Sequence, residues 1–358
     1  MLYEGMNTHD MYTTMKSIAD SSHDMIAHSS KLSVYSDGAK RRIHTEPIRM
    51  GENNWEAVNN SLIDSHADSQ LAKKLDIPKA YYDRMAGESP RLWEISCNDW
   101  LDKLNKTLML RTWTNRNRLP SLRAIVSNSY LRIDNLDIFK TILPILNEQP
   151  DMKIVSGHVD EHRFNLKAIF PRIQGEVAVN DVVQAGVHIQ NTETGNGAFK
   201  IEPFQHRLVC LNGMIIPEAG IRKAHLGSRI GEGTDINFRN ETLEADNKAF
   251  MMKVEDATRQ ATDETRFTYI VNQLKESTER TIDVSPVEQV KILTKKQNLT
   301  EEENNTILMF LHKSDGNTHW DVANAVTSAA GVANNYQSAT ALETLGGQIA
   351  TTPQLLAA

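Results

Sequence analysis

Cysteine is scarce in this chain, with 2 in 358 residues, and neither Cys97 nor Cys210 has a CxxC neighbour. This scarcity argues against a disulfide framework and against a cysteine-based zinc site. Long apolar runs are also missing: the longest, Ile307 to Leu311, falls far short of the ~18 residues that a membrane-spanning helix needs. The N-terminus has no basic segment followed by an apolar one, as a signal peptide would. We therefore expect a cytoplasmic protein with no membrane partner.

Net positive charge is absent as well, since the formal charge is −7. This balance argues against a strongly basic nucleic-acid binder, because neutralising phosphates is the main source of such affinity. The charge is nevertheless segregated along the chain. Residues 101–132 hold seven basic side chains and one acidic one, whereas residues 301–358 hold one basic and six acidic side chains. These clusters are either binding surfaces or simply solvated faces.

The composition is that of a globular protein, with 40% hydrophobic and 24% charged residues, and the length suggests about two domains. Helical periodicity at both ends and period-two alternation between them predict an α+β fold. The fold is a central antiparallel β-meander, flanked by an N-terminal helical region and by a C-terminal helical region with a long helix. The expected parts are an N-terminal arm of uncertain order (1–52), a helical region (53–121), the sheet core (122–233) and the C-terminal helical region (234–358).

Alternation of apolar and polar residues predicts strands at 163–168 and 183–190. Gly195-Asn196-Gly197 can turn the chain, so 183–202 is expected to be a hairpin, and a second hairpin is expected at 153–170. The run from Arg207 to Leu211 resembles a deeply buried strand. The polar face of this sheet, either a binding platform or its wet side, would carry Arg163, Lys167, Gln184, His188, Gln190 and Lys200.

The apolar stripe that begins at Phe250 and Val254 continues to Leu274, which predicts one helix of more than about thirty residues. Further helices are expected to start at Ser285-Pro286, at Thr300 and at Thr318. The last dozen residues are small and polar, which favours a frayed end.

Catalytic patterns are weak throughout the sequence. His206 and Cys210 lie four residues apart, about 13 Å along a strand, which is too far for a nucleophile and its base. The glycines of 227–233 lack the order of a nucleotide-binding loop, and no carboxylates are spaced for a two-metal site. We therefore predict no catalytic residues, no metal and no cofactor, which favours a protein that is not an enzyme but leaves enzyme activity open.

The basic run also contains aromatic residues, because Trp113 and Tyr130 lie among Arg111, Arg116, Arg118 and Arg123. Cations that follow a backbone, combined with aromatic platforms for bases, are typical of single-strand binding proteins. An equally simple interpretation makes Trp113 a core residue and pairs the arginines with the acidic N-terminal helices.

Several stretches resemble the domain of unknown function 932 family, whose members are common in phages, prophages and plasmids. The resemblance covers roughly residues 71–349 and depends on LAKKLDIPKAYYDRM (71–85), LRAIVSNSYLRIDN (122–135), DVVQAGVHIQNTETGNGAFKIEPF (181–204), HRLVCLNGMI (206–215) and NTHWDVANAVTSAAG (317–331). It implies a mobile-element origin. Phage genomes commonly encode single-strand annealing proteins, built on a curved antiparallel sheet backed by helices, and the predicted architecture is similar to that plan.

This similarity implies a protein that binds and anneals single-stranded DNA in recombination, as a homo-oligomer with a positive groove. Trp113 or Tyr130 would stack bases, and phosphates would be neutralised by Arg111, Arg116, Arg118, Arg123, Lys167, Lys200, Arg207, Arg222, Lys223 and Arg229. One alternative is a protein-interaction factor of a mobile element, which recognises a host protein partner through the acidic ends of the chain. Another is a metal-dependent nuclease, whose ligands would have to converge from distant parts of the sequence.

Overall fold

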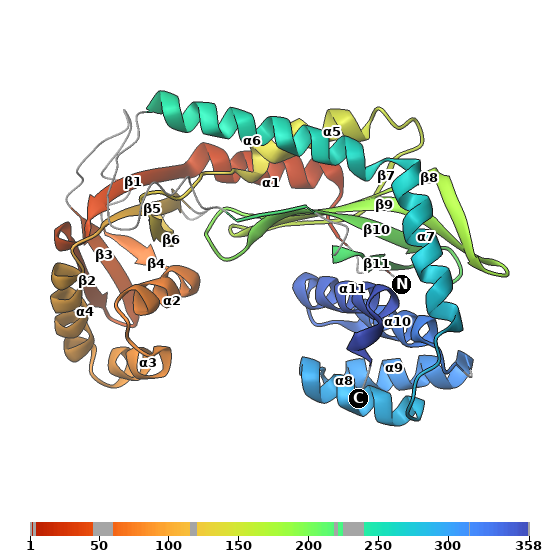
Figure 1. Ribbon diagram of the computed structural model, residues 1–358. Helices are drawn as coiled ribbons and strands as arrows, with labels where there is room; N and C mark the ends of the chain where they lie inside the picture. Colours follow the sequence, from red (N-terminus) through yellow and green to blue (C-terminus); the bar gives the residue numbers. More distant parts are fainter. Residues whose placement is uncertain are drawn as a thin grey trace.

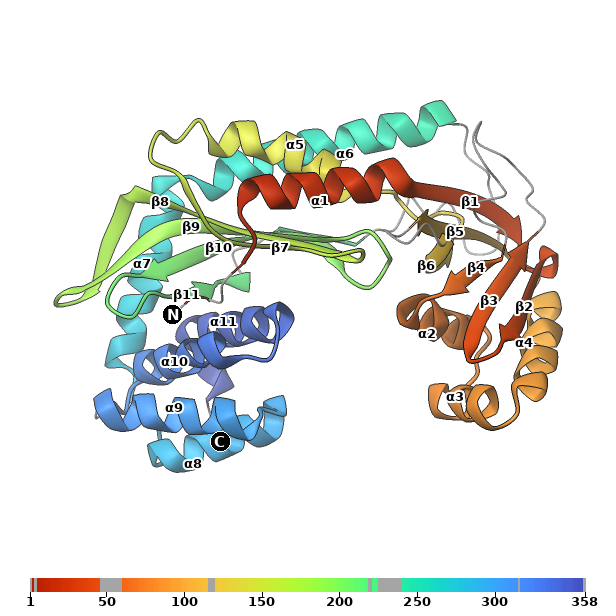
Figure 2. The ribbon, with the colours of Figure 1, turned by 180° about the vertical axis from the view of Figure 1, so that it is seen from behind.

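The computed structural model describes residues 2, 5–45, 60–114, 120–217, 221–224, 240–314 and 316–356. Helices and antiparallel strands combine in an α+β fold, as the sequence predicts. Figures 1 and 2 show two lobes, each with its own sheet, joined along one side by the helix α1 (Thr8–Ser21) and the strand β1 (Ser22–His28) that continues it. In Figure 1, the helices between residues 65 and 104 in one lobe and those between residues 286 and 351 in the other lie below the sheets, whereas the helices over 135–146 and 240–261 lie above, beside α1.

The first lobe contains a sheet in the order β1-β5-β6-β4-β3-β2, covered by three helices. Its core includes Leu71, Trp93 and Cys97 from the helices and Leu110 and Leu122 from the strands. The elements after β1 are η1 (Ser29–Lys31), β2 (Leu32–Asp37), β3 (Lys40–Thr45), β4 (Ser61–Ile63), α2 (Ser65–Lys74), α3 (Lys79–Glu88), α4 (Pro90–Leu104), β5 (Thr107–Thr114) and β6 (Pro120–Ser127).

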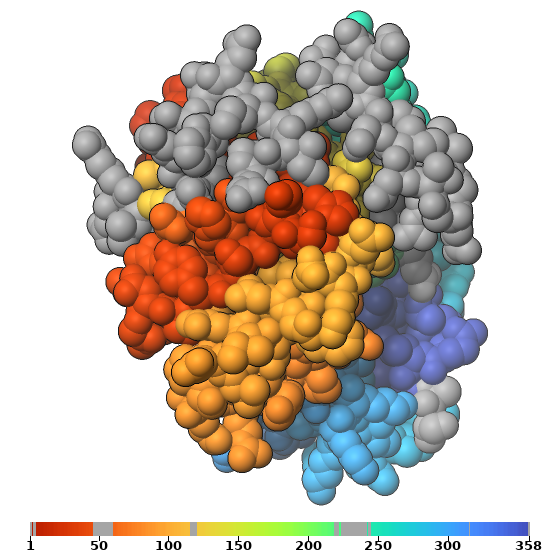
Figure 3. All heavy atoms as spheres, turned by 90° about the vertical axis from the view of Figure 1, so that its left-hand side faces the viewer, coloured from red at the N-terminus to blue at the C-terminus, as the bar shows by residue number. Residues whose placement is uncertain are grey.

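The predicted N-terminal arm is wrong for residues 8–45, which form α1 and three strands of this sheet. Figure 3 shows their atoms, red to orange, in one continuous surface with the atoms of the helices that follow. The predicted helical region 53–121 likewise contains β4, β5 and the start of β6. The cause is tertiary: β1 pairs with β5 over its whole length, and sequence periodicity cannot reveal such a distant partner.

The second lobe is built on a curled antiparallel sheet in the order β11-β10-β9-β8-β7, with β12 also paired to β10. Helices cover it on both faces. Besides α1, the elements are α5 (Asn135–Leu146), β7 (Lys153–Val159), β8 (Arg163–Ala178), β9 (Asp181–Thr192), β10 (Ala198–Arg207), β11 (Asn212–Ile215), β12 (Ile221–Ala224), α6 (Asn240–Ala261), α7 (Glu264–Glu279), α8 (Pro286–Gln297), α9 (Glu301–Ser314), α10 (His319–Ser328), η4 (Ala329–Val332), α11 (Tyr336–Thr351) and η5 (Pro353–Leu355).

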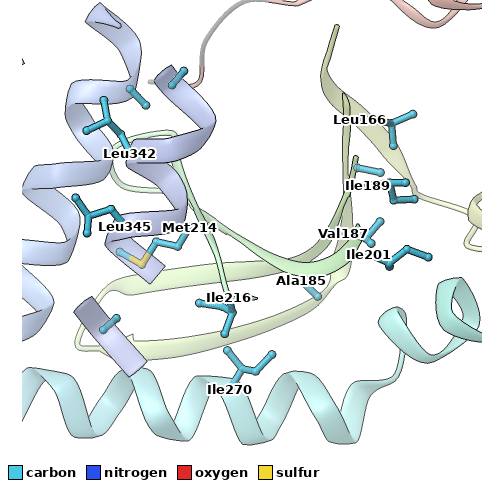
Figure 4. Packing of buried hydrophobic residues seen from close by; sticks show 14 of the residues in the cluster. Leu166, Ala185, Val187, Ile189, Ile201, Met214, Ile216, Ile270, Leu342 and Leu345 are labelled. Atoms are coloured by element: carbon cyan, nitrogen blue, oxygen red, sulfur yellow. The ribbon is translucent and has the colours of Figure 1, made fainter. Parts of the chain in front are cut away.

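Both predicted hairpins are confirmed, and the alternation along β8 and β9 separates the two faces of the sheet as expected. The apolar face includes Leu166, Val187 and Ile201, and Figures 1 and 2 show α1, α5 and α6 along this side. In Figure 4, Met214 of β11 lies beside Leu345 of α11. The opposite, polar face is not simply wet, because its Lys167 forms an ion pair with Glu343 of α11, and α10 and α11 pack near it.

The predicted long helix is broken into α6 and α7, which run in different directions (Figure 1). The first helix ends at Ala261, and Asp263 caps the second, accepting a hydrogen bond of 2.9 Å from the backbone N–H of Arg266. An aspartate that caps a new helix competes with continuation of the old one. The apolar stripe continued across this break, so periodicity alone could not locate it.

The run from Arg207 to Leu211 is not a buried strand. Strand β10 ends at Arg207, and the chain turns through Leu208 and Val209 to Leu211, all three of which are exposed. Leu211 adopts a left-handed φ of 52°, which is unfavourable for a branched side chain. The last residues also differ from prediction, since α11 and η5 order the chain to Leu355.

The predicted helix starts are confirmed by their caps. Ser285 accepts a bond from the backbone N–H of Glu288, and Thr300 and Glu303 exchange bonds as a capping box does. Thr318 and Asp321 form a second capping box.

The outer edge of β2 is covered by side chains of α4. The Asn98 amide accepts from Val34 N–H at 2.7 Å and donates to Val34 C=O at 3.0 Å, and Glu94 accepts from Ser36 N–H at 2.6 Å. These contacts imitate a neighbouring strand. They satisfy backbone groups that would otherwise be open to pairing with another chain.

Replacing Asn98 with alanine should lower the free energy of unfolding by about 1–3 kcal/mol, because two backbone groups of Val34 lose their partner. Urea denaturation followed by circular dichroism measures this effect. Asp99→Ala is the matched control, because Asp99 is exposed on the same helix and its carboxylate accepts from Lys103 of that helix rather than from β2. Equal midpoints for Asn98→Ala and wild type would contradict a role for the amide in the edge.

Candidate nucleic-acid interface

The predicted cation Arg111 is buried, with 2% of its surface exposed. Its guanidinium donates to Asp24 at 2.9 Å, to Asp134 at 2.7 Å and to the backbone carbonyl of Glu193 at 2.7 Å. Burial alone would lower the pKa of Arg111, but these carboxylates outweigh it and raise the pKa. The charge of Arg111 is therefore neutralised by carboxylates inside the protein.

Arg123 is equally buried and binds the Glu193 carboxylate at 2.5 Å and the Glu161 carbonyl at 3.1 Å. The other Glu193 oxygen accepts from the backbone N–H of Asn135 at 2.6 Å. Glu193 lies at the tip of the β9–β10 hairpin, where Gln70 of the first lobe also donates to the Thr194 carbonyl at 2.7 Å. The glycine hairpin is therefore a second connection between the lobes, besides α1 and β1.

The predicted phosphate contacts of Arg111 and Arg123 are thus contradicted, because neither side chain reaches the surface. The aromatic residues of the same run are not open platforms either. Tyr130 is buried, with its hydroxyl 3.3 Å from the Thr192 carbonyl, and Trp113 packs against the main core. The alternative interpretation is correct only in part: Tyr130 is buried and Trp113 packs partly buried against the core, but the arginines pair with Asp24 of β1, with Asp134 and with Glu193 rather than with acidic helices.

Lys167 and Arg207 are also engaged internally. Lys167 is fully buried and forms an ion pair with the fully buried Glu343 of α11. Arg207 donates to both oxygens of Asp181, at 2.6 and 2.7 Å, and its guanidinium lies 5.6 Å from the ring centre of Trp320. Both side chains attach C-terminal helices to the sheet. The structure therefore contradicts a phosphate contact for the fully buried Lys167, whereas the half-buried Arg207 already binds Asp181 and packs on Trp320.

Among the described residues, two further predicted cations are accessible: Lys200 is half-buried on β10, and Arg222 is exposed on β12. Their strands pair so that Lys200 lies opposite Arg222. Lys223 pairs with Phe199 through its backbone, and its side chain lies outside the described part of the structure. Arg116, Arg118 and Arg229, with the glycine-rich 227–233 segment, lie outside the described residues.

The strand register extends this pair into a row across five strands. Lys200 lies opposite Gln190, Gln190 opposite Asn165, and Asn165 opposite His158. We call this row, Arg222, Lys200, Gln190, Asn165 and His158, the polar strip. Arg222 is exposed, Lys200, Gln190 and His158 are half-buried, and Asn165 is buried. Adjacent strands lie ~4.8 Å apart, so the row is about 19 Å long.

A second polar row lies behind the strip. Glu202 and Lys167 lie on either side of His188, and Ser156 lies opposite Lys167. Nδ1 of His188 is 3.2 Å from Glu202, and Nε2 is 3.4 Å from Asn165. Burial lowers the pKa of His188. Burial would raise the pKa of Glu202, but the contacts with His188 and Lys200 lower it.

The strip joins two cations, two amides and an imidazole on one face. Cations bind phosphates, amides can pair with base edges, and a flat ring can stack on a base, so this set suits a single-stranded nucleic acid. The alternation along β9 and β10 had already placed Gln190 and Lys200 on this face. His158 was missed because only the register of β7 against β8 brings it there.

Neither a metal site nor a membrane-spanning helix is found among the described residues. No three histidine, cysteine, aspartate or glutamate side chains among them are grouped so that they could hold a metal ion. None of the helices in these ranges combines the length and apolar character needed to cross a membrane.

Replacing Lys167 with methionine should lower the free energy of unfolding by about 3–5 kcal/mol, because it leaves the Glu343 carboxylate buried without a partner. The double variant Lys167→Met/Glu343→Leu should recover most of this loss, since it removes both charges. Thermal and urea unfolding of the four proteins in the cycle measure both effects. A double variant as unstable as the single one would mean that the pair is not the source of the loss.

Unfolding should become easier as the pH falls below about 6.5, the ordinary histidine pKa. The folded pKa of His188 is lowered by burial, so between these two pKa values the unfolded state binds one more proton. Stability from this group is therefore present above pH 6.5 and lost below it, by up to about 1.4 kcal/mol per pH unit. Urea denaturation from pH 7.5 to 5 gives the free energy of unfolding at each pH. Its slope against pH should be shallower for His188→Gln than for wild type. An unchanged slope would contradict a lowered pKa.

Comparison with known proteins adds no relative. A scan against protein-family models finds no match, and searches of the curated proteins and of the solved structures also find none. The resemblance noted in the sequence therefore stays a prediction, and the geometry of the strip is the basis for assigning a function.

Proposed function

We propose that the protein binds single-stranded DNA along the polar strip and, as a homo-oligomer, brings strands together for annealing. The observation that carries the proposal is the register that aligns Arg222, Lys200, Gln190, Asn165 and His158 across five strands. The resemblance to a family found in phages supports a use in recombination.

Accessible positive charge is concentrated at one end of the strip. Lys200 lies 3.7 Å from Glu202, so part of its charge is compensated, whereas Arg222 is exposed. We therefore expect moderate affinity that depends on salt, because each phosphate contact releases bound counterions. The amides of Gln190 and Asn165 would add contacts to the Watson–Crick edges of bases. In a duplex these edges are occupied by base pairing, so the contacts favour a single strand.

The double variant Lys200→Gln/Arg222→Gln should bind a labelled oligo-dT more weakly and reduce the slope of log affinity against log salt by about 0.7 per lost contact. Fluorescence anisotropy at several salt concentrations measures both quantities. Lys140→Gln is the matched control, since Lys140 is exposed on α5, away from the strip, and its slope should equal that of wild type.

Wild-type protein that fails to bind oligo-dT at low salt would overturn the proposal. Equal slopes for the double variant and the control would leave binding intact but remove the strip as its site. Mass photometry of the same samples tests assembly: monomers at all DNA concentrations would contradict annealing by a homo-oligomer.

The alternative of a protein-interaction factor has one specific observation in its favour. Val179, in the β8–β9 turn, is 87% exposed, and Val209 and Leu211, in the β10–β11 turn, are 60% and 51% exposed. A hydrogen bond from Leu208 N–H to the Val182 carbonyl holds these turns together. Clustered exposed apolar side chains are a feature of protein-binding surfaces. An absence of DNA binding would make this surface the first place to mutate.

A further inference from the structure

The imidazole of His158 at one end of the polar strip is held flat against Tyr336 of α11. The ring centroids are 5.2 Å apart and the planes differ by 16°. Tyr336 itself is buried and fixed: its hydroxyl accepts from Ser156 at 3.1 Å, and Lys167 Nζ lies 4.7 Å from its ring centre. One face of the imidazole is thus covered by an immobile aromatic ring.

The edge of the same imidazole is held as well. Nε2 of His158 lies 3.2 Å from Asp160. Asp160 is itself oriented by the backbone N–H groups of His162 and Arg163, at 2.8 and 2.7 Å. Burial would raise the pKa of Asp160, but these bonds lower it, so the carboxylate stays charged against the ring.

Despite these contacts, 37% of the His158 side chain remains exposed. A ring that is fixed in orientation and still accessible loses little conformational freedom when a ligand packs on it. Tyr336 already has Ser156 and Lys167 as partners, so satisfying the tyrosine does not require the histidine. The remaining accessible surface lies at the end of a row of amides and cations.

We propose that His158 is a stacking platform for one nucleobase of the strand bound on the polar strip. This inference rests on the proposed function and adds a defined subsite to it. A base at this position would stack on the imidazole while the neighbouring amides of Asn165 and Gln190 face its edge or the next nucleotide. Because every base has a flat face, the subsite would favour unpaired bases without selecting a sequence.

The test uses oligo-dT that carries one 2-aminopurine, placed at successive positions, because stacking quenches the fluorescence of this base. Wild-type protein should quench one position most strongly. His158→Ala should abolish this quenching and bind about tenfold more weakly, with the salt slope unchanged. His158→Phe, which keeps a flat ring, should restore both, and urea denaturation should confirm that each variant is folded.

The outcomes distinguish failure of the stacking proposal for His158 from failure of the proposed DNA binding. If His158→Ala binds and quenches like wild type while Lys200→Gln/Arg222→Gln binds weakly, the stacking proposal is wrong and DNA binding stands. A reduced salt slope in His158→Ala would show that the imidazole acts as a cation, which also overturns stacking. If His158→Ala does not fold, the wild-type scan decides, because uniform quenching at all positions contradicts a subsite. Wild-type protein that does not bind at all removes the proposed function itself.

Discussion

The buried carboxylate of Glu193 is the contact on which the arrangement of the two lobes depends. It lies at the tip of the β9–β10 hairpin and joins Arg123 of the first sheet to the backbone of Asn135, while its own carbonyl accepts from Arg111. An uncompensated charge at this depth would cost several kcal/mol, so such a junction is stable only when complete. Buried ion pairs have strict geometry. They therefore fix the orientation of the hairpin relative to the first sheet, and not only its attachment to that sheet.

The motifs that carry the family resemblance form internal polar contacts of the same kind, between segments far apart in the sequence. The hairpin TETGNG enters the first lobe, and Gly195, with a φ of 76°, supplies its turn. The arginine of RLVCLNGM binds Asp181, whose carboxylate also accepts from the indole N–H of Trp320 in NTHWD at 2.9 Å. Three segments far apart in the sequence thus meet at one carboxylate. A distinctive motif can therefore reflect a structural contact between segments as well as a binding site.

Local patterns predicted what depends on neighbours in the chain: the period-two strands, both hairpins, the capped helix starts and the membership of the polar face. They failed where distant partners decide. The excess of positive charge in residues 101–132 suggested a binding surface because its counter-charges, Asp24, Asp134 and Glu193, lie outside that window and meet Arg111 and Arg123 only in the fold. His158 was missed for the same reason, since only strand pairing places it beside Asn165.

The accessibility of the strip follows from the chemistry of the row behind it. Burying Lys167 required a carboxylate and other polar partners, and α11 supplies Glu343 and Tyr336, seven residues apart and therefore on the same side of the helix. A helix that must match these groups cannot slide along the sheet to cover the outer row. The inner pair adds little net stability by comparison with apolar residues, but it fixes where α11 lies. The outer row of Lys200, Gln190 and His158 is then left partly exposed. Because α11 covers only the inner row of the polar face, the polar strip stays available for a ligand.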